Sequence, residues 1–378
     1  MSRLREALDD VAADAPALNL ADVVIAVSRR RRRIRMAAAG SVSAMGLVVL
    51  AGVALGMFPG LGPMQADKPI VVTQSGTIAD LPSRGVGPIS HAYRTFCRVG
   101  GPVPPDCRNG GWRVVTRTGE TYHVPQALGW KSGPNFYPLA TSRDGRIIAY
   151  YSRPAGTFKV RDLASGVEQA APVAIAEAKL GARSRLELSD DGRYLAFTGY
   201  PSLIMDMRAR TTMPLPSGWD PRSIDGTTVT LARYGESGQR PGIWAMPLAG
   251  GGSPVTLGEA YTRFSALAFD GTAVAALRQG QSPLRYDGTI TVLDARTGQV
   301  KKMATMRGLP EGSHILTLGS WLNATEVTLA TLASKEWNEN RHITYAVNVE
   351  TGHVRRLAVY HPQLGGDVVV PGAAAPAL

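Results

Sequence analysis

The chain has 378 residues, 44% of them hydrophobic and 19% charged, a composition that allows a buried core and excludes a disordered protein. Its formal net charge is +11, but no basic run recurs after Arg35, which disfavours binding to nucleic acid. The 42 Gly and 26 Pro residues favour many short strands joined by tight turns over long helices.

Residues 1–35 form a predicted cytoplasmic basic tail that contains eight Arg and five acidic residues. Within it, Leu4, Leu8 and Val11 have the spacing of one helix face. We interpret this segment as an orientation signal that lies on the inner leaflet of the membrane. A docking helix for a cytoplasmic partner is the alternative interpretation.

Residues 36–58 contain no charged residue and no Asn, Gln or His. A helix rises about 1.5 Å per residue, so this stretch spans roughly 34 Å, enough for a hydrocarbon core of about 30 Å. Arginines stand directly before it, and basic flanks stay on the cytoplasmic side. We therefore predict a single transmembrane helix in the cell membrane, with the N-terminus in the cytoplasm and the rest of the chain outside. The arginines that set this orientation are Arg29, Arg30, Arg31, Arg32, Arg33 and Arg35.

A cleaved signal peptide is the alternative to this anchor. The apolar region of a signal peptide usually runs for about 7–15 residues and ends at a site with small residues. Here the apolar run is longer, a long basic tail precedes it, and no clear Ala-x-Ala follows. The pattern therefore favours an anchor.

Residues 59–90 form a predicted linker, in which Ile70–Thr73 is a candidate strand for completing the last unit of a ring. The only two cysteines, Cys97 and Cys107, follow soon after. No His lies between them and no further Cys exists, so they are poor zinc ligands. Outside the cytoplasm a disulfide that closes this Pro- and Gly-rich loop is the better interpretation.

Residues 91–362 contain a recurring Asp-Gly pair that separates two apolar runs. Ser142–Tyr150 and Ser189–Phe197 are close copies of one pattern, and weaker copies follow. Such a pair forms a tight hairpin, because Gly accepts a positive φ and Asp bonds its own backbone. The predicted turn residues, to which we assign a structural role, are Asp144, Gly145, Asp191, Gly192, Asp225, Gly226, Asp270 and Gly271.

A second element, an alternating run that ends in a Gly turn, recurs further along each unit, as in Phe158–Gly166 and Ile290–Gly298. Each unit thus has roughly four short strands in about 35–50 residues, the size of a propeller blade. One such sheet cannot bury both faces, but several around an axis can. We predict an all-β propeller of six blades, or seven if residues 68–110 form a fuller unit, followed by a flexible tail at 363–378. The six units begin near His91, Asn135, Arg183, Asp220, Arg263 and Ile315.

The two close copies share the pattern Ser-x-Asp-Gly-Arg-x-Ile/Leu-Ala-Tyr/Phe, which resembles the TolB-type, WD40-like β-propeller repeat. The resemblance covers about residues 90–360 and implies a propeller that binds protein partners or serves as a platform. The Trp-Asp dipeptide that ends true WD40 blades is absent at the corresponding positions. The layout of a short tail, an Arg cluster, one span and an outer propeller is similar to that of membrane-anchored actinobacterial proteins, and this likeness implies no activity.

Motifs for chemistry are missing from the sequence, so we predict no catalytic, cofactor-binding or metal-binding residues. Neither a Gly-x-Ser-x-Gly elbow nor a phosphate-binding loop occurs. The six His residues lack the spacing of ligands on one helix turn. The densest acidic turn, Asp190-Asp191-Gly192, supplies too few oxygens for calcium.

Three functions fit this pattern. We prefer a non-enzymatic, membrane-anchored binding or scaffold module that presents loops to a protein or cell-envelope partner outside the cytoplasm. A propeller hydrolase or lyase with a metal at the central channel is the second, and it requires three or four ligating side chains from different blades. A transmembrane sensor that acts through a docking helix at Leu4–Val11 is the third. No small-molecule ligand is indicated.

Overall fold

The computed structural model describes residues 78–94, 111–129, 139–181, 184–234, 240–280, 286–311, 313–333, 341–360 and 368–372. All of them belong to the second of two compact units, Ala66–Leu378. The predicted span, the arginines before it, Cys97 and Cys107 lie outside the described residues. Within the described ranges, no helix has the length and apolar character needed to cross a membrane.

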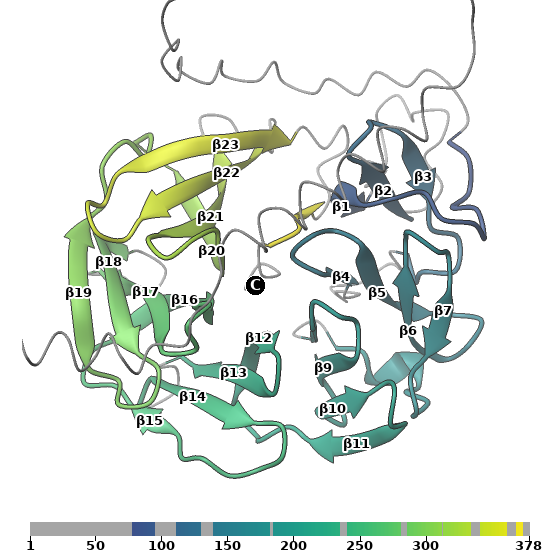
Figure 1. The fold of residues 1–378 in the computed structure, drawn as a ribbon, viewed down its shortest axis with the longest axis horizontal. Coiled ribbons are helices and arrows are strands. Elements are labelled where there is room, and N and C mark those ends of the chain that lie inside the picture. The colour runs from purple at the N-terminus through teal and green to yellow at the C-terminus, as the bar shows by residue number, and fades with distance from the viewer. Residues whose placement is uncertain are drawn as a thin grey trace, which may run out of the picture. The chain divides into compact units, whose positions relative to one another are not determined.

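Six four-stranded antiparallel sheets form the unit and lie as blades around a central axis (Figure 1). Blade 1 contains β24 (Val368–Val369), β1 (Ile89–Arg94), β2 (Trp112–Thr116) and β3 (Thr121–His123). Blade 2 contains β4 (Leu139–Thr141), β5 (Ile147–Ser152), β6 (Thr157–Asp162) and β7 (Glu168–Ala170). Blade 3 contains β8 (Arg185–Leu188), β9 (Tyr194–Thr198), β10 (Leu203–Asp206) and β11 (Thr211–Pro214).

The other three blades continue in chain order. Blade 4 contains β12 (Asp220–Asp225), β13 (Thr228–Arg233), β14 (Gly242–Pro247) and β15 (Val255–Thr256). Blade 5 contains β16 (Tyr261–Leu267), β17 (Ala273–Gln279), β18 (Tyr286–Asp294) and β19 (Val300–Thr305). Blade 6 contains β20 (His314–Trp321), β21 (Glu326–Ala333), β22 (Arg341–Asn348) and β23 (Val354–Tyr360). In the described ranges the one helical element is a 3-10 turn, η1 (Glu177–Lys179).

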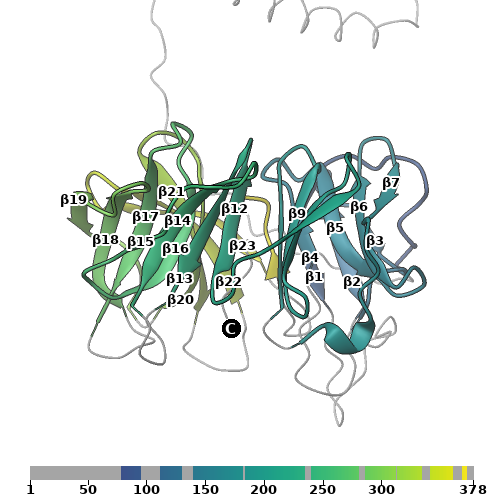
Figure 2. The same cartoon turned by 90° about the horizontal axis from the view of Figure 1, so that it is seen from below.

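The six blades confirm the predicted fold class, and the predicted unit starts lie within four residues of the first strand that each blade takes from its own segment. The blades pack face to face around the axis (Figure 1 and Figure 2), so the middle strands are covered on both faces. Their buried runs are accordingly continuous, as in Trp112–Thr116, where every residue is buried. Between blades 2 and 3 the rings of Phe158 and Phe197 pack with centroids 4.8 Å apart.

The ring is closed by the C-terminal strand. Strand β24 pairs with β1 through Ala92 with Val369 and Tyr93 with Val368. Blade 6 has four strands of its own, so it does not need the candidate strand Ile70–Thr73, which lies outside the described residues. The prediction of a flexible tail is therefore wrong for residues 368–369. A strand of two residues is too short to show a period in the sequence, and only the unpaired inner edge of β1 explains its place.

Blades 2 to 6 each carry two hairpin turns on the same face of the ring, which we call the turn face. We call the turn between the innermost and second strands the axial turn, and the turn between the third and fourth strands the outer turn. Backbone hydrogen bonds of 2.8 Å join the two, from Met207 N to Arg193 O in blade 3 and from Ala295 N to Thr272 O in blade 5. The innermost strands of blades 2 to 6 therefore each deliver an axial turn to one end of the axis, whereas β24 of blade 1 has no hairpin to β1.

Candidate functional site at the axial turns

The axial turns of blades 2 and 3 have the same internal hydrogen bonds. The buried Ser142 Oγ donates to Asp144 Oδ1 at 2.7 Å and accepts from Ile147 N at 3.0 Å. Ser189 Oγ likewise donates to Asp191 Oδ1 at 2.7 Å. Each carboxylate also accepts a backbone N–H two residues on, at 3.0 Å in blade 2 and 3.1 Å in blade 3. These side chains bond their own turn, which is a structural role.

The predicted glycines lie in the same turns. Their φ angles are positive, between 56° and 72°, a region that residues with a Cβ rarely adopt. In blade 5, Asp270 Oδ1 accepts from Thr272 N at 2.9 Å. That bond lowers the pKa of Asp270 and keeps the carboxylate ionised. The glycines concerned are Gly145, Gly192, Gly226 and Gly271.

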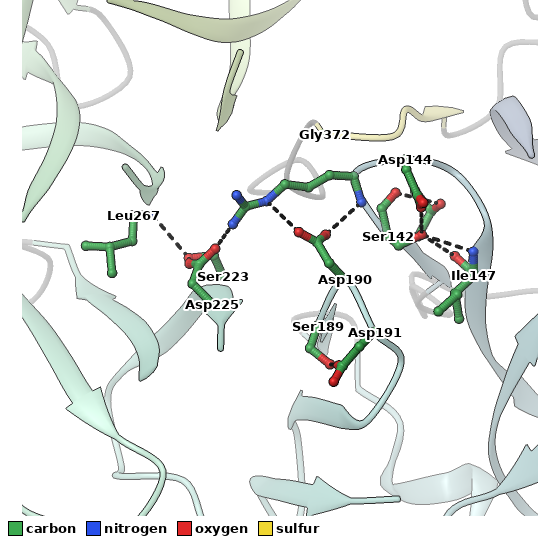
Figure 3. Close-up of polar contacts among 12 residues, drawn as sticks. Ser142, Asp144, Ile147, Ser189, Asp190, Asp191, Ser223, Asp225, Leu267 and Gly372 are labelled. Atoms are coloured by element: carbon green, nitrogen blue, oxygen red, sulfur yellow. Dashed lines mark hydrogen bonds and ion pairs between the residues drawn. The ribbon is translucent and has the colours of Figure 1, made fainter. Parts of the chain in front are cut away.

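Four residues of the axial turns come together from four different blades. Arg143 of blade 2 forms ion pairs with Asp190 of blade 3, at 3.5 Å, and with Asp225 of blade 4. The Arg143 backbone N–H also donates to Asp190 Oδ1 at 3.0 Å. Its guanidinium carbon lies 5.8 Å from the ring centroid of Phe269 in blade 5. Figure 3 shows Asp190 and Asp225 joined to one guanidinium group. We call Arg143, Asp190, Asp225 and Phe269 the axial cluster.

The axial cluster crosses the axis, because blades 2 and 5 lie opposite each other in the ring (Figure 1). Its members are unequally exposed: the side chain of Asp225 is 19% exposed, whereas Asp190 is 53% and Phe269 is 65% exposed. Leu322, in the axial turn of neighbouring blade 6, is a second exposed apolar residue at 43%. The cluster thus combines shielded charge with accessible apolar surface.

Carboxylates outnumber cations at the described axial turns. Arg143 is one cation there, and Arg117 of blade 1 reaches the same turns by donating to Asp144 O at 2.8 Å. Arg146 and Arg193 point to the outer turns, where they pair with Asp162 and Asp206. The carboxylates are those of Asp144, Asp190, Asp191, Asp225 and Asp270.

Beneath the turns, guanidinium groups bond the edges of innermost strands in other blades. Arg222 of β12 is 1% exposed; its Nε donates to Phe264 O at 3.2 Å and its terminal nitrogen to Leu318 O at 3.3 Å. Arg263 Nε donates to Leu316 O at 2.7 Å. An innermost strand has no strand neighbour at its inner edge, so these carbonyls need such donors.

A buried carboxyl group lies beside these arginines. Burial raises the pKa of Glu187 on β8 to about 7, although Arg222 and Arg185 act in the opposite direction. Arg185 itself pairs with Asp220 at 3.6 Å. Among the described residues, Oε1 of Glu187 has no hydrogen-bond partner. The sequence analysis missed Glu187, because a Glu that alternates with two leucines in a strand is expected to face solvent.

The histidines described by the structure do not gather into a site. His342 is buried and His91 is half-buried at the junction of blades 1 and 6, and loss of solvation lowers the pKa of each to about 4. The His91 ring lies 4.8 Å from that of Tyr360. In the described ranges, no group of three or more His, Cys, Asp or Glu side chains is placed to hold a metal ion.

No protein-family model matches the chain, and no curated protein matches it. Solved structures with a similar fold include TolB from Acinetobacter baumannii, with 17% identity and a TM-score of 0.46, covering 74% of this chain. That match spans 65% of the TolB chain, slightly under two thirds of its length. A chain of a nidogen–laminin complex is 12% identical, with a TM-score of 0.43 over 75% of this chain and 99% of that one.

The β-propeller domain of Cps50 (Swd1) from Myceliophteria thermophila is also similar, with 12% identity, a TM-score of 0.38, and coverage of 61% of this chain and 74% of that one. At such identities the likeness concerns the fold alone. The repeat pattern and the six sheets lead to the same fold independently of these neighbours. The described part of the chain is therefore a six-bladed β-propeller, consistent with TolB-like and WD40-like propellers.

Proposed function

We propose that the protein is a non-catalytic binding or scaffold module, anchored in the cell membrane by residues 36–58, whose propeller engages a protein or cell-envelope partner outside the cytoplasm. The uncharged stretch of 23 residues and the six arginines near its start support the anchor and its orientation. The propeller fold supports a binding role in general terms.

The axial cluster is the observation that carries the proposal. Turn positions that only build a hairpin need no partner from another blade, yet Arg143, Asp190, Asp225 and Phe269 come together from four blades. Departures from a local rule are expected where a protein has a function. An exposed aromatic ring beside shielded charges is also typical of protein interfaces. We therefore place the partner on the turn face.

Site-specific cross-linking on the full chain in cells tests this placement. A photoreactive residue at Leu322 samples the turn face, and the matched control at Tyr200 samples the opposite face, where β9 connects to β10. Both positions are exposed, at 43% and 78%. We expect a discrete protein or glycan adduct from Leu322 that is absent from Tyr200. No adduct from Leu322, or the same adducts from both positions, would contradict the proposal.

The anchor has its own test. Protease added to intact cells, with the outer layers made permeable, should cut within residues 59–378 and leave an epitope fused before Met1 protected. The reason is that only the tail lies in the cytoplasm. The anchor proposal would be wrong if the cells processed the full chain to a soluble propeller that has lost residues 1–58. It would also be wrong if the protease cut the epitope together with the propeller.

A disulfide between Cys97 and Cys107 follows from the same topology, since thiols outside the cytoplasm are usually oxidised. Mass spectrometry of the protein from cell envelopes, without reduction, should find the two cysteines in one cross-linked peptide. Protein made in a reducing cytoplasm is the control, and both of its cysteines should react with an alkylating reagent. Free thiols in the envelope sample would exclude the bond.

A further inference from the structure

The guanidinium of Arg143 is held like a bound ligand. Two carboxylates, from Asp190 and Asp225, and the face of one aromatic ring, Phe269, surround it from three other blades. This is the arrangement by which proteins recognise a guanidinium or ammonium group, because carboxylates supply charge and the ring supplies its negative face. The groups that surround Arg143 are therefore those of a cation-binding surface.

Arg143 is not needed by its own turn. Ser142 and Asp144 complete the hairpin hydrogen bonds, and in blade 3 the same turn forms with Asp190 in the position of Arg143. The Arg143–Asp190 pair is partly exposed, and such ion pairs contribute only about 0–1 kcal/mol, while the more buried Asp225 would pair with the incoming cation in place of Arg143. A cation from outside can therefore replace Arg143 at a small cost in stability.

The surroundings also indicate which partner fits. Five axial-turn carboxylates face three described cations, Arg143, Arg117 and Lys301, so the surface still complements positive charge. Phe269 and Leu322 expose apolar side chains on neighbouring turns beside those carboxylates. A segment that carries an Arg or Lys next to an apolar residue satisfies both features at once.

We propose that the axial cluster recognises a basic side chain of a protein partner, flanked by apolar residues, and that Arg143 occupies this place when the partner is absent. The inference rests on the proposed function of the turn face and names its partner class. Arg143 then acts as an internal competitor, and binding requires its displacement from Asp190 and Asp225.

Peptide binding to the purified propeller-containing chain tests this competition. The probe is a capped tripeptide with arginine between two leucines, and the control peptide replaces arginine with citrulline, which has the same shape without the charge. By calorimetry we expect Arg143→Ala to bind the arginine peptide at least tenfold more tightly than the wild type. The citrulline peptide should show no such gain, and adding Asp225→Asn to Arg143→Ala should abolish it.

Arg143→Gln provides a second variant that keeps part of the side chain without its charge if Arg143→Ala does not fold. Circular dichroism checks that each variant is folded. An arginine peptide that binds a folded Arg143 variant no better than the wild type overturns the inference, as does equal binding of the citrulline peptide. The cross-linking at Leu322 involves no Arg143 variant. A partner found there, combined with a negative peptide result, would therefore refute this inference and leave the proposed function standing.

Discussion

At the scale of the residue, the outer turns show how one position can be strained. Asp162, Asp206, Asp294 and Asn348 each accept backbone N–H bonds that close the turn. Four residues further on, three blades have Gly with φ between 71° and 80°. Blade 3 has Arg210 there, with φ of 57°. A side chain in this left-handed region costs roughly 1–2 kcal/mol.

Arg210→Gly should therefore raise the free energy of unfolding by about 0.5–1 kcal/mol, the relief of strain being partly offset by the greater freedom of Gly in the unfolded chain. Urea denaturation measures the change. Gly298→Ala is the matched control and should destabilise, since its Cβ would meet Val255 Cγ1 at 2.6 Å and φ is 71°. A variant at Arg210 no more stable than the wild type would contradict this account.

Glu187 gives a residue-scale prediction for pH dependence. Its pKa of about 7 in the folded protein lies above the ordinary value of 4.5, so the folded state holds more protons between these values. Its contribution to stability is therefore complete below about pH 4.5 and is lost as the pH rises towards 7. His91 and His342, with a pKa of about 4, act with the opposite sign and cost stability as the pH falls below 6.5.

Comparison of Glu187→Gln with the wild type isolates the carboxyl group, because both proteins keep the histidines and the neighbouring charges of Arg185, Asp220 and Arg222. Urea denaturation at pH 5, 6 and 7 should show that the variant loses less stability over this range than the wild type. Parallel curves for the two proteins would mean that Glu187 titrates normally.

At the scale of the element, the axial turn is a unit closed by one buried hydroxyl. Ser142 Oγ donates a hydrogen bond to Asp144 and accepts one from the N–H of Ile147. Its removal leaves a buried backbone donor without a partner, which costs about 1–3 kcal/mol. The same Ser-x-Asp-Gly chemistry recurs in blade 3, so the hairpin is specified locally.

Ser142→Ala should accordingly lower the free energy of unfolding by about 1–2 kcal/mol, as measured by chemical denaturation. Ser165→Ala is the control, because Ser165 lies exposed in an outer turn, where it accepts a bond of 3.3 Å from Val167 N and its hydroxyl bonds the solvent-accessible carboxylate of Asp162. The control should change stability by less than about 0.5 kcal/mol. Equal effects at the two serines would refute the role given to the axial hydroxyl.

At the scale of the whole molecule, the ring depends on its closing strand. Val368 and Val369 are 6% and 3% exposed, and Gly372 O accepts bonds from Ser320 N and from Thr328 Oγ1 in blade 6. Residues 368–372 thus join blade 1 to blade 6. Without them the inner edge of β1 loses its partner and two buried valines lose their contacts.

A chain that ends at residue 366 should therefore unfold at a midpoint about 5–10 °C lower than the full chain, from burial of about 1.5–3 kcal/mol per valine. Differential scanning calorimetry measures the midpoint. A chain that ends at residue 372 keeps the strand and is the control, with an expected midpoint close to that of the full chain. Equal midpoints for the two truncations would show that β24 does not hold the ring.

The sequence by itself predicted six blades, with seven left open, the places where the blades begin and the chemistry of their hairpins. Those features depend on residues close together in the chain, such as Ser142 and Asp144, and they repeat, so they can be found by comparing segments. The membrane anchor, its orientation and the disulfide come from the same kind of local pattern and stay predictions.

Only the tertiary structure decided how the ring closes and what meets at its axis. Arg143 and Asp225 are 82 positions apart and face each other because six blades place their turns around one axis. The two valines of β24, the bonds from Arg222 to blades 5 and 6, and the burial of Glu187 follow in the same way. A local pattern encodes a turn, whereas the partners across the axis depend on the number of blades and on the strand that completes the circle.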